Sequence, residues 1–163
     1  MENITINKML MTNPNTQNFF LGTFPCDSPP PSFRNFPCCA VFNLDNKSEG
    51  GSHWVAVFCP SPRKVWYFDA LGLGPNPCLL ESLQRGLKFL VFSRNVYPFM
   101  KAISTVCGHY VVYFLYKCCL GWTLKEVVTH LAYRVTQPPD EYVKNFVKIL
   151  ASHHPSSIRG LFR

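Results

Sequence analysis

The chain has 163 residues, 47% of them hydrophobic and 15% aromatic, which is enough for one globular domain with a core of its own. No apolar run approaches the roughly 20 residues of a membrane-spanning helix, and residues 1–13 lack the long apolar stretch of a signal peptide. The net charge of +7 indicates either a polyanionic partner, with nucleic acid ahead of a membrane surface, or solubility alone. We therefore expect one intracellular domain, residues 1–163, with no membrane contact and with dispersed cations that suit diffuse phosphate contacts.

Eight cysteines are spread over the chain, and their spacing indicates neither a metal site nor a disulfide framework. The adjacent pairs Cys38-Cys39 and Cys118-Cys119 do not have metal-ligand spacing, and the Cys-x-x-Cys pattern of zinc sites does not occur. An intracellular chain keeps its thiols reduced. We therefore expect no metal, and we interpret most of these thiols as small apolar core side chains.

The first half of the chain predicts short strands. Phe19–Phe24 is a brief apolar segment, and the stretch 25–37 that follows is rich in Pro and Ser and cannot form regular structure. A polar turn is expected over Asn43–Gly51, and the turn at 60–63 joins two strands into a hairpin. The predicted strands are Cys38–Leu44, His53–Phe58 and Val65–Phe68.

The second half of the chain predicts helices. Leu79–Phe92 carries leucines at helical spacing, and a short extended piece is expected near Val96–Phe99. Thr123 and Glu126 have the spacing of a capping box, and Gly121 suits the end of the preceding helix. The other helices are predicted over 107–119, 124–134 and 140–150. Strands followed by helices predict an α+β fold.

Three segments each present one titratable side chain beside a predicted element. Cys107 precedes an apolar helix, where the positive end of the helix dipole lowers the pKa of a thiol. His53 begins one strand of the hairpin, and Asp69 follows the other. Because paired strands lie about 4.8 Å apart, residues near their matching ends can be hydrogen-bonding neighbours. A thiol, an imidazole and an orienting group are what a cysteine protease needs, and Gly108 leaves the amides around the thiol uncrowded for an oxyanion.

Each of these residues taken singly also has a structural interpretation. A histidine on a strand is commonly a hydrogen-bonded core residue, and a cysteine before an apolar helix is commonly part of the core. Asp69, which precedes Ala-Leu-Gly, has the setting of a turn cap. It is the combination of His53, Asp69 and Cys107 that indicates nucleophilic chemistry.

The motifs resemble those of the adenovirus protease (adenain) family of cysteine endopeptidases, including its adenovirus-like and Maverick/Polinton relatives. The resemblance runs from Asn18 to about Leu120. It rests on Phe-Phe-Leu-Gly-Thr-Phe, Gly-Gly-Ser-His-Trp, Tyr-Phe-Asp-Ala-Leu-Gly, and Cys-Gly-His-Tyr before an apolar helix. It implies a papain-like, adenain-like cysteine protease fold, with a small mixed sheet and the nucleophile at the N-terminus of a buried helix. The order of His, acidic residue and Cys is shared with SUMO-protease-like relatives.

The resemblance also implies roles for individual residues. Cys107 is the expected nucleophile, and its backbone N–H is expected to donate to the oxyanion. His53 is the expected general base, and Asp69 is expected to orient the His53 ring. Trp54 is expected beside the histidine, where it shapes the substrate cleft, although plain core packing suits it equally. The implied substrates are viral capsid and core precursors, cut after small residues during virion maturation, by a monomer in the host nucleus and virion. No cofactor is obligatory, but DNA and a short activating peptide are implied.

Two features depart from the family pattern. The family places a Gln about seven residues before the cysteine as an oxyanion donor, and here Met100 stands there. Losing one such donor typically costs roughly 10²- to 10³-fold in kcat. Asn95, Ser104 and Thr105 are the nearby side chains that could donate to the oxyanion in place of the Gln. No cysteine lies between Cys78 and the nucleophile to hold a disulfide-linked peptide. Two alternatives therefore stay open: a deubiquitinase or deSUMOylase, and a low-activity DNA-binding pseudoprotease.

Overall fold

The computed structural model describes residues 1–30, 32–44, 53–101 and 104–153. The strands of this part are β1 (Phe20–Pro25), β2 (Cys38–Asn43), β3 (Trp54–Ser61), β4 (Lys64–Phe68) and β5 (Val91–Arg94). Its helices are α1 (Asn3–Thr12), α2 (Pro77–Gly86), α3 (Cys107–Cys119), α4 (Leu124–Tyr133) and α5 (Pro139–Ser152). None of these helices is both long and apolar enough to cross a membrane.

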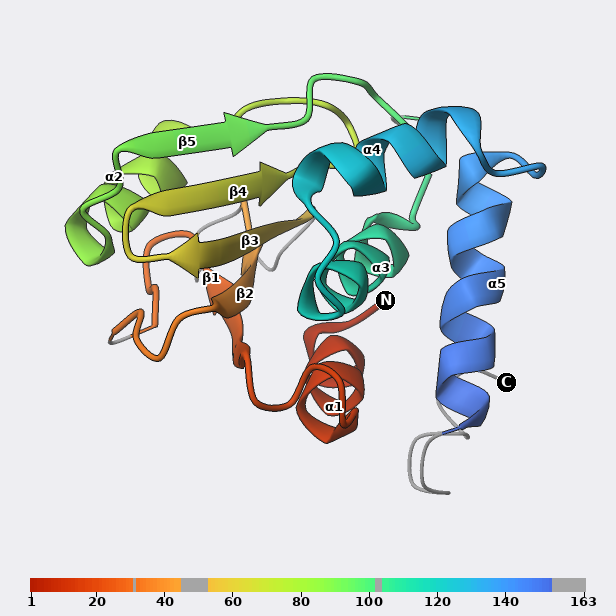
Figure 1. The fold of residues 1–163 in the computed structure, drawn as a ribbon, viewed down its shortest axis with the longest axis horizontal. Helices are drawn as coiled ribbons and strands as arrows, with labels where there is room; N and C mark the ends of the chain where they lie inside the picture. The colour runs from red at the N-terminus through yellow and green to blue at the C-terminus, as the bar shows by residue number, and fades with distance from the viewer. Residues whose placement is uncertain (31, 45–52, 102–103, 154–163) are drawn as a thin grey trace.

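The sheet is mixed and is buried on both faces. Its strand order is β1-β2-β3-β4-β5, with antiparallel pairs on either side of β3 and parallel pairs at both edges. Along β3, Val55 and Val57 belong to a core shared with α2, whereas Ala56 and Phe58 belong to a core shared with α3. Figure 1 shows α2 apart from the other four helices, which gather around α3. Because successive strand residues point to opposite faces, burial of both faces explains why β2 and β3 read as nearly continuous apolar runs.

Most of the predicted elements are confirmed. The three predicted strands correspond to β2, β3 and β4, and the helices predicted over 107–119, 124–134 and 140–150 correspond to α3, α4 and α5. The capping box is present, because Thr123 Oγ1 accepts the Glu126 N–H at 3.2 Å and the Glu126 carboxylate accepts the Thr123 N–H at 2.7 Å. Six of the eight cysteines are buried, in keeping with their interpretation as core side chains. Most of the predicted turn Asn43–Gly51, and the tail from 154 onward, lie outside the described residues.

The prediction of one helix over Leu79–Phe92 is wrong. α2 ends at Gly86, and Leu87 adopts extended backbone with φ −136° and ψ 130°. The chain then forms β5, which pairs in parallel with β4 at the free edge of the β3–β4 hairpin. The leucine spacing reflects only neighbouring residues, so it cannot reveal that β4 is available as a pairing partner for this segment. The strand also lies before the extended piece expected at Val96–Phe99, which is irregular. α1 has no counterpart among the predicted elements.

Candidate active site

Two strand ends bring His53 and Asp69 together. His53 directly precedes β3 and Asp69 directly follows β4, and the pairing of Ala56 with Phe68 sets these two ends side by side. His53 Nε2 lies 2.6 Å from Asp69 Oδ1, and the Asp69 carboxylate is fully buried. The same carboxylate oxygen accepts the Leu71 N–H at 2.8 Å, which fixes the carboxylate within its own turn. The predicted pairing of these strand ends is therefore present.

The third predicted residue, Cys107, is the first residue of α3, the helix that packs against β3. Its side chain is buried and hydrogen-bonds with the His53 ring. Because Nε2 of His53 contacts Asp69, Nδ1 is the ring nitrogen left for the thiol. The structure thus brings all three predicted side chains into one chain of contacts, Asp69 to His53 to Cys107.

The electrostatics of this group favour an ion pair between sulfur and imidazole. Burial of the His53 ring favours its neutral form, but the hydrogen bond and charge of Asp69, together with Cys107, raise the pKa of His53 to about 9. Burial likewise opposes ionisation of Cys107, yet His53 and the backbone amides of Trp54 and Gly108 lower the pKa of the thiol. A lowered thiol pKa beside a raised imidazole pKa is the condition for a thiolate and an imidazolium to coexist.

Trp54 contacts the site through two different groups. Its backbone amide hydrogen-bonds the Cys107 sulfur, whereas its half-buried indole donates from Nε1 to the Met1 carbonyl oxygen at 3.1 Å. Met1 also lies over the start of α3, because a Cβ at Gly108 would come within 2.7 Å of the Met1 Cβ. Trp54 therefore joins the N-terminal residue to the wall of the site. The sequence gives no signal for this contact.

Two of the three side chains suggested as a second oxyanion donor, Asn95 and Ser104, have other partners. Met100, at the position of the family's Gln, is 5% exposed and packs in the core. The side-chain amide of Asn95 accepts from the Asp69 N–H and donates to the Asp69 carbonyl oxygen. Ser104 Oγ donates to Asp140 Oδ2 at 3.0 Å. The remaining suggestion, Thr105, is exposed. The backbone amides of Cys107 and Gly108 begin α3 and have no intrahelical acceptors, so they are the donors that the helix itself offers an oxyanion.

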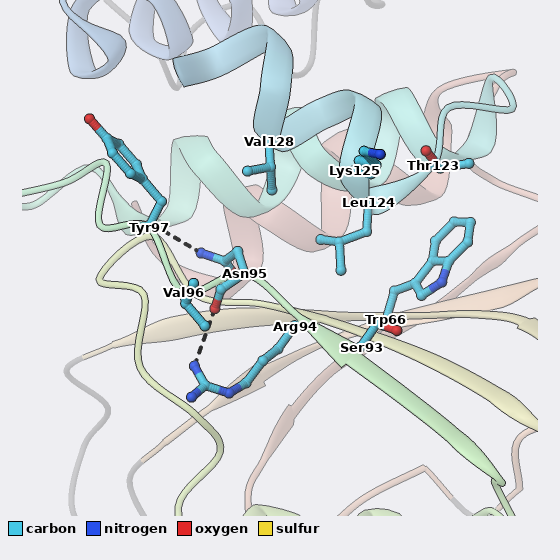
Figure 2. A pocket seen from close by; sticks show the side chains of 10 residues that line it. All are labelled: Trp66, Ser93, Arg94, Asn95, Val96, Tyr97, Thr123, Leu124, Lys125 and Val128. Carbon is cyan, nitrogen blue, oxygen red and sulfur yellow. Dashed lines mark hydrogen bonds between the residues drawn. The ribbon is translucent and has the colours of Figure 1, made fainter. Parts of the chain in front are cut away.

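A cavity of about 370 Å³ opens between the end of β5 and the start of α4. Figure 2 shows Trp66 and Leu124 in its wall, with Arg94 and Lys125 among its lining residues. Asn95 also lines this cavity, and its side chain points along the loop to Tyr97. Asn95 therefore links the wall of this cavity to the backbone of Asp69, which its side chain also binds. Among the described residues, no group of three or more His, Cys, Asp or Glu side chains has the arrangement of a metal site.

The fold is that of the papain-like, adenain-like cysteine proteases, as predicted. The solved structure of the ASFV pS273R protease matches this chain with a TM-score of 0.59 and 16% sequence identity. The match covers 85% of this chain and 63% of that chain. An identity this low shows a shared fold and no more.

Sequence comparison finds relatives among the adenovirus proteases. The protease of snake adenovirus serotype 1 is 27% identical over 122 residues, which cover 67% of this chain and 61% of the relative. The protease of bovine adenovirus 4 is 32% identical over 112 residues, which cover 60% of this chain and 55% of the relative. These matches confirm the resemblance to the adenovirus protease family, although the chain spans only about three fifths of the length of these relatives. No protein-family model matches the chain.

Proposed function

We propose that this chain is a viral cysteine endopeptidase that uses Cys107 as nucleophile, His53 as general base and acid, and Asp69 as the group that orients the imidazole. The observation that carries the proposal is the chain of contacts from the buried Asp69 carboxylate through His53, at 2.6 Å, to a thiol at a helix start. The sequence similarity to adenovirus proteases supports it.

The acylation step follows from this geometry. The Cys107 thiolate attacks the scissile carbonyl carbon, a C–S bond forms, and the carbonyl π electrons move to oxygen. Backbone amides at the start of α3 donate to this oxyanion, where the helix dipole also favours negative charge. The His53 imidazolium then gives its proton to the departing amine as the C–N bond breaks, which leaves a thioester. Asp69 keeps the ring in the orientation that points Nδ1 at this proton transfer.

In deacylation the same groups act, but His53 is now a general base. His53, now neutral, takes a proton from a water molecule as the water oxygen attacks the thioester carbonyl. Collapse of the second oxyanion breaks the C–S bond, releases the carboxylic acid product and returns the thiolate beside the imidazolium. The raised pKa of His53 suits it to hold the proton in the resting enzyme, from the end of deacylation until the next acylation.

The proposal is tested with short fluorogenic peptides that carry a Gly-x-Gly cut site. Cys107→Ala is expected to abolish cleavage, whereas Cys119→Ala, at the other end of the same helix, is expected to retain it. Cleavage at the wild-type rate by Cys107→Ala would refute the proposal. The same enzyme is offered ubiquitin-type fluorogenic conjugates, and preferential hydrolysis of these would favour the isopeptidase alternative.

The low-activity alternative makes a separate prediction. If the missing amide at Met100 limits turnover, Met100→Gln should raise kcat on the peptide substrates, because a second donor stabilises the oxyanion. An unchanged kcat in a folded variant would mean that the backbone amides of α3 already suffice. Thermal unfolding of the variant is measured in parallel, because the Met100 side chain is buried and an amide there needs partners.

The finer biology of the resemblance forms part of the proposal. We propose that residues 1–163 act as one monomeric catalytic domain, that its substrates are capsid and core precursors, and that it acts in the host nucleus and in virions. We further propose stimulation by a peptide that binds non-covalently. A non-covalent mode suits this chain because the Cys78 thiol lies 2.8 Å from that of Cys26, and both pack in a different core cluster from Cys107.

DNA is the remaining proposed partner, and one surface of the protein supports it. The backbone amides of Leu90 and Val91 donate to the Arg63 carbonyl, which sets the segment after α2 beside the β3–β4 turn. A Cβ at Gly86 would touch the Phe33 ring at 3.1 Å, which sets the loop before β2 beside the end of α2. The exposed cations of this surface are Arg34, Arg63, Lys64, Arg85 and Lys88.

The DNA proposal is tested by fluorescence anisotropy with a short duplex over a range of salt concentrations. Reversing both Arg63 and Lys64 to Glu should reduce the slope of log K against log salt by about one for each phosphate that the variant no longer binds. Reversing both Lys8 and Lys148 to Glu, at exposed positions of α1 and α5, is the control of matched charge change. Equal effects of the two changes would show that net charge, and not this surface, governs binding.

A further inference from the structure

Asp69 lies where the strand ladder ends, and this leaves its backbone in need of another partner. The last residue pair between the parallel strands β4 and β5 is Tyr67 with Arg94. Asp69 comes two residues after Tyr67, and Asn95 comes directly after Arg94. The carboxyl ends of parallel strands meet at the same edge of a sheet, so these two residues become neighbours. A buried backbone amide beyond the last ladder bond has to be satisfied by a side chain or by water.

Asn95 supplies that partner with both ends of its side-chain amide. Its Oδ1 accepts the Asp69 N–H at 2.9 Å, and its Nδ2 donates to the Asp69 carbonyl oxygen at 2.6 Å. Nδ2 also donates to the Tyr97 carbonyl oxygen at 3.3 Å, a hydrogen bond drawn as a dashed line in Figure 2. The side chain is 3% exposed. Only Asn and Gln carry a donor and an acceptor in this fixed arrangement, so the amide stands in for one more residue of a strand.

The rest of the loop adds to this attachment without replacing it. The backbone amides of Phe99 and Met100 both donate to the Ala70 carbonyl oxygen, at 2.8 and 3.0 Å. These bonds hold the turn after Asp69, and the Gly72 N–H donates to the Asp69 carbonyl oxygen at 2.8 Å. Asn95 binds the Asp69 carbonyl oxygen as well and also accepts the Asp69 N–H. A contact of 2.6 Å between His53 and the carboxylate tolerates a displacement of only about 0.5 Å.

We propose that Asn95 is a positioning residue that holds the Asp69 backbone at the end of the sheet, so that its carboxylate stays in contact with His53. This inference rests on the proposed function of these residues. It assigns to Asn95 no contact with substrate or with the reacting atoms. It predicts that removal of the amide releases the carboxylate from the ring, so that the imidazolium loses its partner and the thiolate loses its imidazolium.

The test is the pH dependence of Cys107 alkylation by iodoacetamide, followed by mass spectrometry of the labelled peptide. This readout needs no substrate, so it remains informative even if wild-type protein cleaves no peptide. In wild-type protein the thiolate–imidazolium pair should persist up to about pH 9, where His53 loses its proton. In Asn95→Ala that upper limit should fall by at least one pH unit. On peptide substrates kcat should fall at least tenfold with little change in KM.

The matched control is Ser82→Ala on α2, on the opposite side of the sheet. Ser82 is fully buried and its Oγ donates to the Cys26 carbonyl oxygen at 2.5 Å, so its replacement also removes a buried hydrogen bond. Each variant is measured at the same interval below its own Tm. A fall of the upper limit in Asn95→Ala alone supports the proposal, whereas an unchanged limit, or equal falls in both variants, overturns it.

A second variant keeps the proposal falsifiable if Asn95→Ala fails to fold. Asn95→Ser retains a hydroxyl that can make one of the two bonds to the Asp69 backbone. The upper pH limit of Asn95→Ser should lie measurably below that of wild type, with a fall smaller than the one pH unit expected when both bonds are lost. A folded Asn95→Ser protein with the wild-type profile would overturn the proposal.

Discussion

The substitution Asp69→Asn isolates the contribution of one carboxylate to the state of the nucleophile. In wild-type protein the pKa of His53 rises from 6.5 to about 9 against the opposing effect of burial. At about 1.4 kcal/mol per pH unit, this rise corresponds to about 3 kcal/mol in favour of the imidazolium. Removing the charge of Asp69 removes its main support, so the pKa of His53 should return to 6.5 or below.

The effect on Cys107 can be estimated from this change. A thiol with the ordinary pKa of 9.0 is about 1% ionised at pH 7, so a return of Cys107 from its lowered pKa to this value reduces the thiolate population by at most about 100-fold. A more basic thiolate is also more nucleophilic, which offsets about tenfold of this fall. We therefore expect the rate of alkylation by iodoacetamide at pH 7 to fall in Asp69→Asn, by at most about tenfold.

The assay is the rate of Cys107 alkylation from pH 5 to pH 10. The sign is fixed by the two pKa changes: the pair forms as Cys107 loses its proton and disappears as the pH rises through about 9. Near pH 10 both proteins should carry a free thiolate, so their rates should converge. An unchanged profile in Asp69→Asn would refute the reasoning, and a variant that is slow even at pH 10 would point to a distorted site instead.

Three further predictions concern other parts of the molecule. Gly72→Ala should destabilise the protein by at least about 2 kcal/mol in thermal unfolding, because Gly72 has φ +71° and a Cβ there would lie 2.7 Å from a backbone oxygen. Gly121 has φ +99° but open space around it, so Gly121→Ala should destabilise the protein by only about 1 kcal/mol. An electrophile at neutral pH should label Cys107 before Cys26, whose burial raises its pKa to about 12; uniform labelling would contradict this. Thr123→Ala should lower the free energy of unfolding by about 1 kcal/mol in chemical denaturation, because it removes the capping box, and an unchanged midpoint would show that the cap contributes nothing.

The sequence by itself determined the local elements and the chemical types at the site. Alternation and apolar runs are properties of neighbouring residues, so they predict β2, β3 and α3, and the Thr123–Glu126 spacing predicts the capping box. The strand ends beside His53 and Asp69 follow from the predicted hairpin. The motif order adds the resemblance to the adenovirus proteases, which the sequence matches confirm.

Only the tertiary structure decided which side chains share hydrogen bonds across long stretches of chain. Leucine spacing cannot show that the residues after Gly86 leave the helix, because the hydrogen bonds that draw β5 into the sheet belong to a distant strand. For the same reason Asn95 reads in the sequence as a candidate oxyanion donor, whereas in the fold its amide is occupied by the backbone of Asp69, 26 residues away. A polar residue's type is written in the sequence, but its partner is set by the packing that brings two segments together.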